Sequence, residues 1–94
     1  MTILQIEHAV PDFGAWKKAF DSDPVGREQG GVRRYRVLRP IDNPNYVIVD
    51  LEFDSSAKAE AFHAALRELW RGVGGRAAES PRARIIEAVE DKKY

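Results

Sequence analysis

Polar and apolar residues alternate along four stretches of the chain. In residues 3–10 the even positions are mainly apolar, and in residues 46–53 every odd position is apolar. A period of two is typical of a strand that buries one face, so both stretches are predicted strands. Residues 32–38 are rich in β-branched and aromatic side chains, and residues 82–90 alternate weakly; these are the predicted second and fourth strands.

Residues 11–20 have the spacing of a short amphipathic helix. Phe13, Trp16 and Phe20 recur at intervals of three and four residues, which places them on one helical face. Pro11 stops the first strand and fits the first turn of the helix, and Asp12 puts a negative charge near the positive helix end. A helix this short has to pack its aromatic face against another element.

Residues 54–70 form the second predicted helix. Its first three residues, Asp54, Ser55 and Ser56, are all candidate N-caps. Its apolar face consists of Ala59, Phe62, Leu66, Leu69 and Trp70. The sequence GVGG at 72–75 is expected to end this helix.

Turn-forming residues occupy the two remaining connections, residues 21–31 and 40–45. The chain therefore reads as β-α-β twice over. Two split β-α-β units predict an α+β, ferredoxin-like βαββαβ fold, with a four-stranded antiparallel sheet and both helices on one face. At 94 residues the chain, 1–94, is expected to form a single domain.

The two halves of the chain can be aligned at two offsets, and the choice decides which sheet face each side chain occupies. Alignment of Val10 with Phe53 gives an offset of 43 residues, and alignment of Asp12 with Asp54 gives 42. A shift of one residue exchanges the two faces. We choose 43 for the strands because it gathers their apolar residues under the helices, and this choice also turns His8 toward the helices.

The sheet face away from the helices is predicted to be unusually apolar for a solvent-exposed surface. It carries Ile3, Gln5, Glu7, Ala9, Tyr46, Ile48, Asp50 and Glu52. We expect a second copy of the chain to cover it, which makes the protein a homodimer through the sheet face. The arginines at 34, 36, 82 and 84 are in phase with the carboxylates of this face, where they would form cross-strand pairs or, alternatively, an anion site.

Fifteen basic and fifteen acidic residues give the chain a formal net charge of zero. This balance argues against a nucleic-acid partner and against binding to an anionic membrane surface. No stretch reaches the roughly 20 apolar residues of a membrane-spanning helix, and the N-terminus does not resemble a signal peptide. The chain has no cysteine, which excludes disulfides, thiolate metal sites and cysteine nucleophiles. A cytoplasmic location is the expectation.

His8 is the first candidate for chemistry, because it is the one polar residue on the helix-facing side of the first strand. A neutral histidine there could act as a general base, or it could be a core residue with a hydrogen-bonded partner. Trp16 and Trp70, with Tyr35, are candidates for the walls of a pocket that binds a small hydrophobic ligand. The alternative for the aromatic residues is the hydrophobic core that a chain this short needs.

No motif indicates a metal or an organic cofactor. The two histidines, His8 and His63, have no metal-binding spacing, and His63 is interpreted as a partly exposed helix residue. The GVGG sequence follows a helix rather than preceding one, so it lacks the position of a phosphate-binding loop. We therefore predict no cofactor.

The order of these elements, with PDF at 11–13, a tryptophan-containing helix and DNPNYV at 42–47, resembles the dimeric α+β-barrel superfamily over nearly the whole chain. That superfamily includes small antibiotic biosynthesis monooxygenases, isomerases, cyclases and haem-degrading enzymes. The resemblance implies a barrel formed by two sheets, with a small hydrophobic ligand between the sheet and helices of each subunit. Haem-degrading members have an asparagine on the first strand and a histidine in the helical region. Here Gln5 and Glu7 stand on the first strand and no histidine follows Trp70, which counts against haem.

Three functions remain open. The first is a cofactor-independent monooxygenase, isomerase or cyclase that acts on a hydrophobic aromatic or polyketide-like compound near His8, Trp16, Tyr35 and Trp70. The second is a non-catalytic ligand-binding or stress-response barrel, and the third is a homodimeric protein-interaction module. The fold alone does not decide among them.

Overall fold

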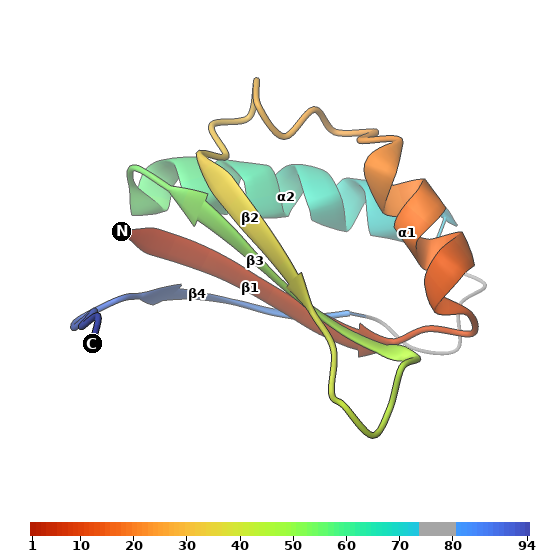
Figure 1. Cartoon of the computed structure of the whole chain (residues 1–94). Coiled ribbons are helices and arrows are strands. Elements are labelled where there is room, and N and C mark those ends of the chain that lie inside the picture. The colour runs from red at the N-terminus through yellow and green to blue at the C-terminus, as the bar shows by residue number, and fades with distance from the viewer. Residues whose placement is uncertain (74–80) are drawn as a thin grey trace.

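A computed structural model describes residues 1–73 and 81–94 of the chain. The elements follow the order β1 (Thr2–Ala9), α1 (Phe13–Asp21), β2 (Arg34–Leu38), β3 (Tyr46–Phe53), α2 (Ser56–Val73) and β4 (Arg82–Glu87). The strands form an antiparallel sheet in the order β2-β3-β1-β4 (Figure 1). This arrangement is the predicted ferredoxin-like βαββαβ fold.

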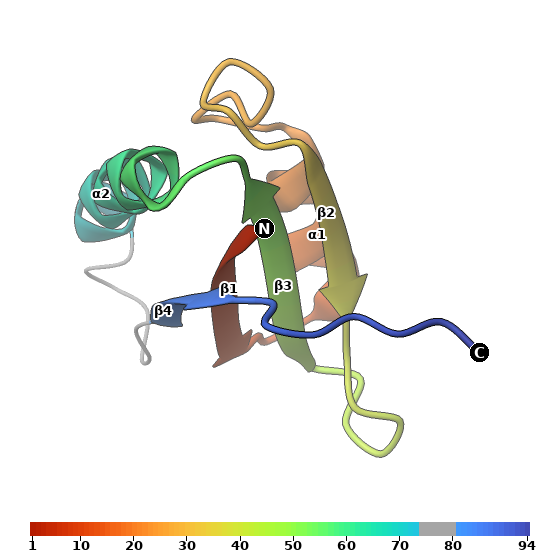
Figure 2. The same cartoon turned by 90° about the vertical axis from the view of Figure 1, so that its left-hand side faces the viewer.

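The register of β1 against β3 decides which side chains face the helices. His8 lies opposite Val47, whereas Gln5 lies opposite Asp50. These pairs confirm the face assignment that follows from the offset of 43 residues, because His8 shares its face with the apolar residues of β3. Both helices lie over this face, and Figure 2 shows α2 beside β1 and β4 and α1 behind β2 and β3.

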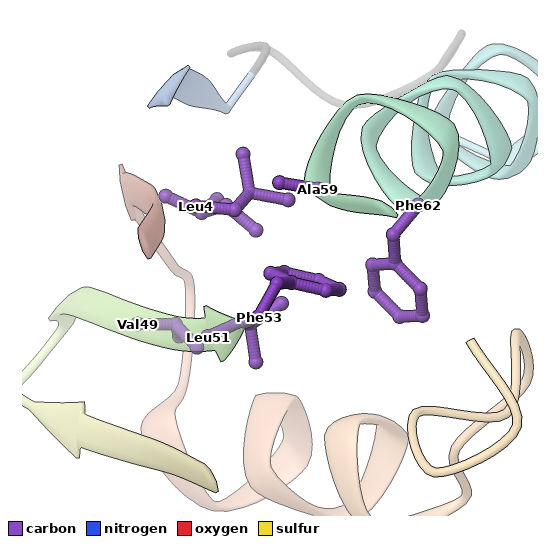
Figure 3. Close-up of a cluster of buried hydrophobic side chains, with 7 residues drawn as sticks. Leu4, Val49, Leu51, Phe53, Ala59 and Phe62 are labelled. Atoms are coloured by element: carbon purple, nitrogen blue, oxygen red, sulfur yellow. The ribbon is translucent and has the colours of Figure 1, made fainter. Parts of the chain in front are cut away.

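The hydrophobic core lies between the sheet and α2. Leu4, Leu51 and Phe53 are at most 2% exposed, and the ring of Phe62 lies 5.6 Å from that of Phe53 (Figure 3). Burial of one side chain of this size contributes about 1.5–3 kcal/mol to stability. The apolar residues that recur with a period of two in β1 and β3 therefore pack against the apolar residues of α2 in one layer.

Helix α1 differs from α2 because none of its residues is buried. Its N-terminus is capped by Asp12, whose Oδ2 accepts a hydrogen bond from Ala15 N at 2.8 Å. Pro11 therefore lies before the cap and not within the first turn, where it was expected. The aromatic stripe of α1 is partly exposed, and its residues Trp16 and Phe20 pack against the edge of the core.

Helix α2 begins after one of its three predicted caps. Ser55 Oγ accepts a hydrogen bond from Lys58 N at 3.3 Å, which makes Ser55 the N-cap. The helix continues to Val73, and residues 74 and 75 of its predicted end lie outside the described residues. Where the structure describes the chain, neither helix has both the length and the apolarity to cross a membrane.

Two strands are shorter than predicted. β2 begins at Arg34 rather than at residue 32, because Val32 N donates to Arg27 O at 3.0 Å and so belongs to the preceding loop. β4 ends at Glu87 rather than at residue 90. The loop between α1 and β2 is therefore longer, and more extensively hydrogen-bonded, than its turn-forming composition alone indicates.

Candidate functional site

A cleft of about 1220 Å³ opens on the helix-facing side of the sheet. Side chains from β1, β3, α1, α2 and the loop after α1 line it, and most of them are apolar. Half-buried side chains of α1 border this space on one side, and α2 borders it with Phe62, Leu66, Leu69 and Trp70. The cleft is larger than a typical small-molecule pocket of about 300–1,000 Å³.

An aromatic wall runs along α1 on one side of the cleft. Trp16 and Phe20 stack with their ring centroids 5.1 Å apart and an interplanar angle of 23°, and Phe13 lies 5.8 Å from Trp16. The ring of His8 contacts Trp16 edge-on, at 6.5 Å between centroids. Stacked and edge-on ring pairs each add about 0.5–1.5 kcal/mol beyond the burial of their area. The rings of the wall therefore hold one another in place.

His8 stands at the end of this wall, half-buried on the helix-facing side of β1, and its side chain lines the cleft. Its Nδ1 lies 3.1 Å from Ala9 O. Protonation at Nδ1 would let that atom donate to the carbonyl and would make Nε2 the basic nitrogen. Because His8 lines the cleft, its ring could reach a molecule bound there, and a general base needs such access.

Of the three residues predicted to form the pocket walls, two line the cleft and one does not. Trp16 lines the cleft from α1, and Trp70 lines it from α2. Tyr35 does not line this cleft but lies on the edge strand β2, where it is 42% exposed and contacts Phe20 edge-on at 5.1 Å. It borders a second hollow instead. The cleft thus brings together His8, Trp16 and Trp70, and Tyr35 lies beyond Phe20.

His63 lies on α2 outside the described lining of the cleft, with its ring 6.3 Å from that of Trp70. Burial, together with the Arg67 guanidinium, lowers the pKa of His63 from its ordinary value of 6.5. The side chain is half-buried, so its interpretation as a partly exposed helix residue is confirmed. Within residues 1–73 and 81–94, no group of three or more histidine, aspartate or glutamate side chains could hold a metal ion.

Arg27 is a candidate that the sequence did not single out. Its guanidinium carbon lies 4.1 Å from the ring centroid of Phe20 and 4.9 Å from that of Tyr35. The side chain lines the cleft and is 17% exposed. The sequence signal was weak, since it consisted of one arginine among turn-forming residues directly after the aromatic helix.

The opposite sheet face carries a chain of polar contacts across all four strands. Arg84 Nη2 donates to Gln5 Oε1 at 2.8 Å, and Gln5 Nε2 donates to Asp50 Oδ1 at 3.0 Å. Arg36 Nη2 donates to the other oxygen of Asp50 at 3.0 Å, and Asp50 is 6% exposed. Asp50 therefore forms a cross-strand pair with Arg36, which was the first of the two alternatives predicted for this face. Arg84 instead binds the amide oxygen of Gln5.

No protein-family model matches the chain, and no curated protein matches it significantly. Solved structures do share its fold. A candidate antibiotic biosynthesis monooxygenase from Nitrosomonas europaea is 21% identical, with a TM-score of 0.69 over 96% of this chain and 100% of that chain. A variant of SnoaB, a cofactor-independent oxygenase from Streptomyces nogalater, is 14% identical, with a TM-score of 0.72 over 96% of this chain and 93% of that chain. A dimeric ferredoxin-like protein from an uncultured marine organism is 7% identical, with a TM-score of 0.67 over 99% of this chain and 98% of that chain.

At identities this low, the likeness shows the fold. The chain has the fold of antibiotic biosynthesis monooxygenase-like, dimeric ferredoxin-like proteins. The resemblance stated from the sequence is thereby confirmed at the level of architecture. What the cleft binds has to be argued from its own residues.

Proposed function

We propose that the chain is a cofactor-independent enzyme that binds a flat hydrophobic compound, aromatic or polyketide-like, in the cleft above the sheet. The observation that carries the proposal is the cleft itself, an apolar space of about 1220 Å³ with an aromatic wall and few polar groups. Such a site favours a flat apolar ligand, because burial of the ligand's surface drives binding. The oxygenase SnoaB, described as cofactor-independent, has the same fold and adds support.

His8 is the residue proposed to start the reaction. An anthrone or a hydroquinone carries an acidic enol or hydroxyl group, and Nε2 of a neutral His8 would accept its proton. The resulting enolate or phenolate is electron-rich enough to reduce molecular oxygen. For an anthrone, one oxygen atom enters the ring and the other leaves as water, which gives an anthraquinone. The protein then supplies proton transfer and enclosure, and the substrate supplies the electrons.

The aromatic residues are proposed to hold and shield the planar substrate. Trp16 and Trp70 line the cleft from the two helices and offer large flat surfaces with little conformational freedom to lose. Enclosure between them would keep water from the reactive anion. Tyr35 is proposed to act only indirectly, through its contact with the ring of Phe20.

Turnover of a panel of anthrones and hydroquinones, followed by quinone absorbance and oxygen consumption, tests the proposal. The His8→Ala variant is expected to lower kcat/KM by about 10²–10⁴-fold, the usual contribution of a general base. His63→Ala is the matched control, because this second histidine lies outside the described lining of the cleft. Equal rates for the wild type and His8→Ala would remove His8 from the reaction. Binding of the panel without turnover by the wild type would favour a ligand-binding barrel instead.

We also propose that a second copy of the chain covers the sheet face opposite the helices. That face combines the polar chain through Asp50 with apolar residues, among them the cross-strand pairs Ile3–Ile86 and Ile48–Leu38. Leu38 is 38% exposed and Ile86 is 36% exposed. Pairing of two such faces would remove this apolar surface from water. The dimeric ferredoxin-like protein of the same fold adds support.

Light scattering at micromolar concentration tests the dimer. The expected mass is twice the 10.6 kDa of one chain. Ile48→Lys places a charge within the proposed interface and should shift the mass toward one chain. Ile41→Lys is the control, because Ile41 is fully exposed in the hairpin between β2 and β3. A wild-type mass of 10.6 kDa would reject the dimer.

A further inference from the structure

We infer that Arg27 recognises an anionic oxygen, a carboxylate or a phenolate, on a flat aromatic ligand in the cleft. This inference rests on the proposed function, because it names the substrate class of the same cleft. Among the described residues that line the cleft, Asp12 and Asp23 are the carboxylates, and Arg27 is the one arginine or lysine. Its position, its spare hydrogen-bond donors and the loop that carries it all point to a ligand with negative charge.

The guanidinium of Arg27 is placed on aromatic rings rather than in water. Its central carbon lies 4.1 Å from the ring centroid of Phe20 and 4.9 Å from that of Tyr35, and the side chain is 17% exposed. A cation over a ring face is attracted by the ring quadrupole. In this partly desolvated position, its interaction with an anion is stronger than it would be in water. The rings thus hold a cation at the boundary of the cleft.

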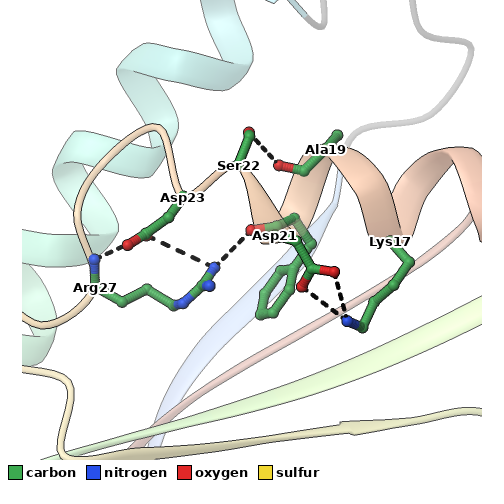
Figure 4. Close-up of polar contacts among 7 residues, drawn as sticks. Lys17, Ala19, Asp21, Ser22, Asp23 and Arg27 are labelled. Carbon is green, nitrogen blue, oxygen red and sulfur yellow. Dashed lines mark hydrogen bonds and ion pairs between the residues drawn. The ribbon is translucent and has the colours of Figure 1, made fainter.

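Most of the hydrogen-bonding capacity of this guanidinium is left over. Nη1 donates to Phe20 O at 2.8 Å, and among the residues that the structure describes this is the side chain's single hydrogen bond (Figure 4). The nearest carboxylate oxygen, Asp23 Oδ1, lies 3.7 Å from Nη1, beyond hydrogen-bond distance. A guanidinium has five N–H donors in a planar fork that matches a carboxylate. Arg27 therefore forms an ion pair with Asp23 but retains hydrogen-bond donors for a ligand.

The loop after α1 is built so that Arg27 cannot easily swing away. Both of its backbone groups are bonded, since its N donates to Asp23 Oδ1 at 2.9 Å and its O accepts from Val32 N at 3.0 Å. Asp23 has a φ of 53° and Gly26 a φ of 83°, in the left-handed region that residues with a Cβ rarely adopt. Glycine adopts this region without cost and aspartate does so more often than most residues, so these two positions define the turn that leads into Arg27. The loop therefore presents Arg27 in a prearranged position.

Arg27 and His8 lie at the two ends of one ring wall. His8 contacts Trp16, Trp16 stacks on Phe20, and Phe20 carries the guanidinium of Arg27. A flat ligand along this wall would meet a base at one end and a cation at the other. Arg27 would thus orient a ligand whose anionic oxygen lies away from the ionisable group that His8 deprotonates.

Two probes with the same ring system and different charge test the inference. Isothermal titration calorimetry measures the dissociation constants of 2-naphthoate and of its neutral isostere 2-naphthamide. The wild type should bind the carboxylate about tenfold more tightly than the amide, as expected for a charge-assisted hydrogen bond in a partly buried site. Arg27→Gln should bring the ratio close to one and leave the affinity for the amide unchanged. Arg27→Lys should keep part of the preference for the carboxylate, because it keeps the charge without the planar fork.

Arg39→Gln is the matched control. Arg39 also stacks on a ring of α1, with its guanidinium carbon 4.4 Å from the Phe13 centroid, but it lies outside the described lining of the cleft. This variant should keep the wild-type ratio. Circular dichroism establishes that each variant is folded. If Arg27→Gln does not fold, the inference is tested on the wild type by itself. Its preference for the carboxylate over the amide should fall as KCl is raised from about 20 mM to about 500 mM, since salt screens a partly exposed charge.

The outcomes separate this inference from the proposed function. Binding of both probes with the same ratio in the wild type and in Arg27→Gln would overturn the role of Arg27 and leave the ligand cleft intact. An equal loss of affinity for both probes in Arg27→Gln would show a merely structural role and would also overturn it. If neither probe binds the wild type, the cleft is not a site for flat aromatic ligands, and the proposed function falls together with the inference.

Discussion

The packing of the loop after α1 against the core can be tested at one position, Gly30. A Cβ atom at Gly30 would lie 2.5 Å from Cδ1 and 2.7 Å from Cε1 of Phe62, and 3.2 Å from the carbonyl oxygen of Gly26. Carbon atoms pack at about 3.5–4.0 Å, so the ring would have to move by about 1 Å. Phe62 is 4% exposed and lies against Phe53, which leaves little room for that movement.

The magnitude follows from two opposing contributions. Overpacking of a well-filled core costs about 1–3 kcal/mol, whereas a change from glycine to alanine stabilises by about 0.4–1 kcal/mol through the unfolded chain. We expect Gly30→Ala to lower the free energy of unfolding by about 1–2 kcal/mol, and to lower the Tm of a domain of this size by about 5–15 °C. Urea unfolding followed by circular dichroism, at one fixed protein concentration, measures the change.

Two further variants make the Gly30 prediction specific. Gly14→Ala adds the same methyl group in α1, where the nearest atom is Asp12 Oδ2 at 3.4 Å, and should stabilise by about 0.5 kcal/mol. Phe62→Leu reduces the ring that the new methyl group meets, so Gly30→Ala should cost less in that background than in the wild type. Wild-type stability for Gly30→Ala, with the expected gain for Gly14→Ala, would show that the loop does not pack on Phe62 as described.

Two other predictions concern α1 and α2. Asp12→Ala removes the oxygen that accepts from Ala15 N and should cost about 1 kcal/mol in urea unfolding, whereas Asp12→Asn should keep most of that stability; equal losses would contradict the capping role. His63 has a lowered pKa in the folded chain, so the unfolded chain, with a pKa of 6.5, takes up its proton at higher pH. The stability contribution is therefore present above pH 6.5 and is lost as the pH falls through 6.5 toward the folded pKa. His63→Gln should flatten the fall in unfolding midpoint between about pH 7.5 and pH 5.5; an unchanged profile would assign that fall to other groups.

The strand faces could be predicted because one physical rule decides them. A strand that buries one face alternates with a period of two, and a shift of one residue would expose every buried side chain. The choice of offset that buried Leu4, Val49 and Leu51 together therefore also determined the face of His8, which the pairing of His8 with Val47 confirms. The ends of β2 and α1 were harder to predict, because they depend on single hydrogen bonds such as that from Val32 N to Arg27 O.

The composition of the cleft could be predicted only in part. Trp16 and Trp70 follow from helical spacing, since each belongs to the apolar face of its helix. Tyr35 is on the helix-facing side, opposite Leu51, but it lies at the sheet edge and outside the cleft because β2 is an edge strand, and the local sequence pattern does not predict that. The position of the Arg27 side chain depends on the positive φ of Asp23 and on contacts with Phe20, seven residues earlier in the chain. Neither feature leaves a trace in the periodicity of the sequence.

The aromatic stripe of α1 bears on why this chain has a cleft at all. Complete burial of a Phe side chain contributes about 1.5–3 kcal/mol, and Phe13, Trp16 and Phe20 are each only half-buried. The exposed part of the three rings therefore corresponds to about 1–2 kcal/mol of burial that the chain leaves unused, against the roughly 5–15 kcal/mol of net stability that a domain has. A small domain has little reason to leave these rings partly open if they serve only the core. A flat ligand of the kind proposed above would cover the same rings and restore that burial, which is the physical reason to test this stripe as part of the proposed binding site.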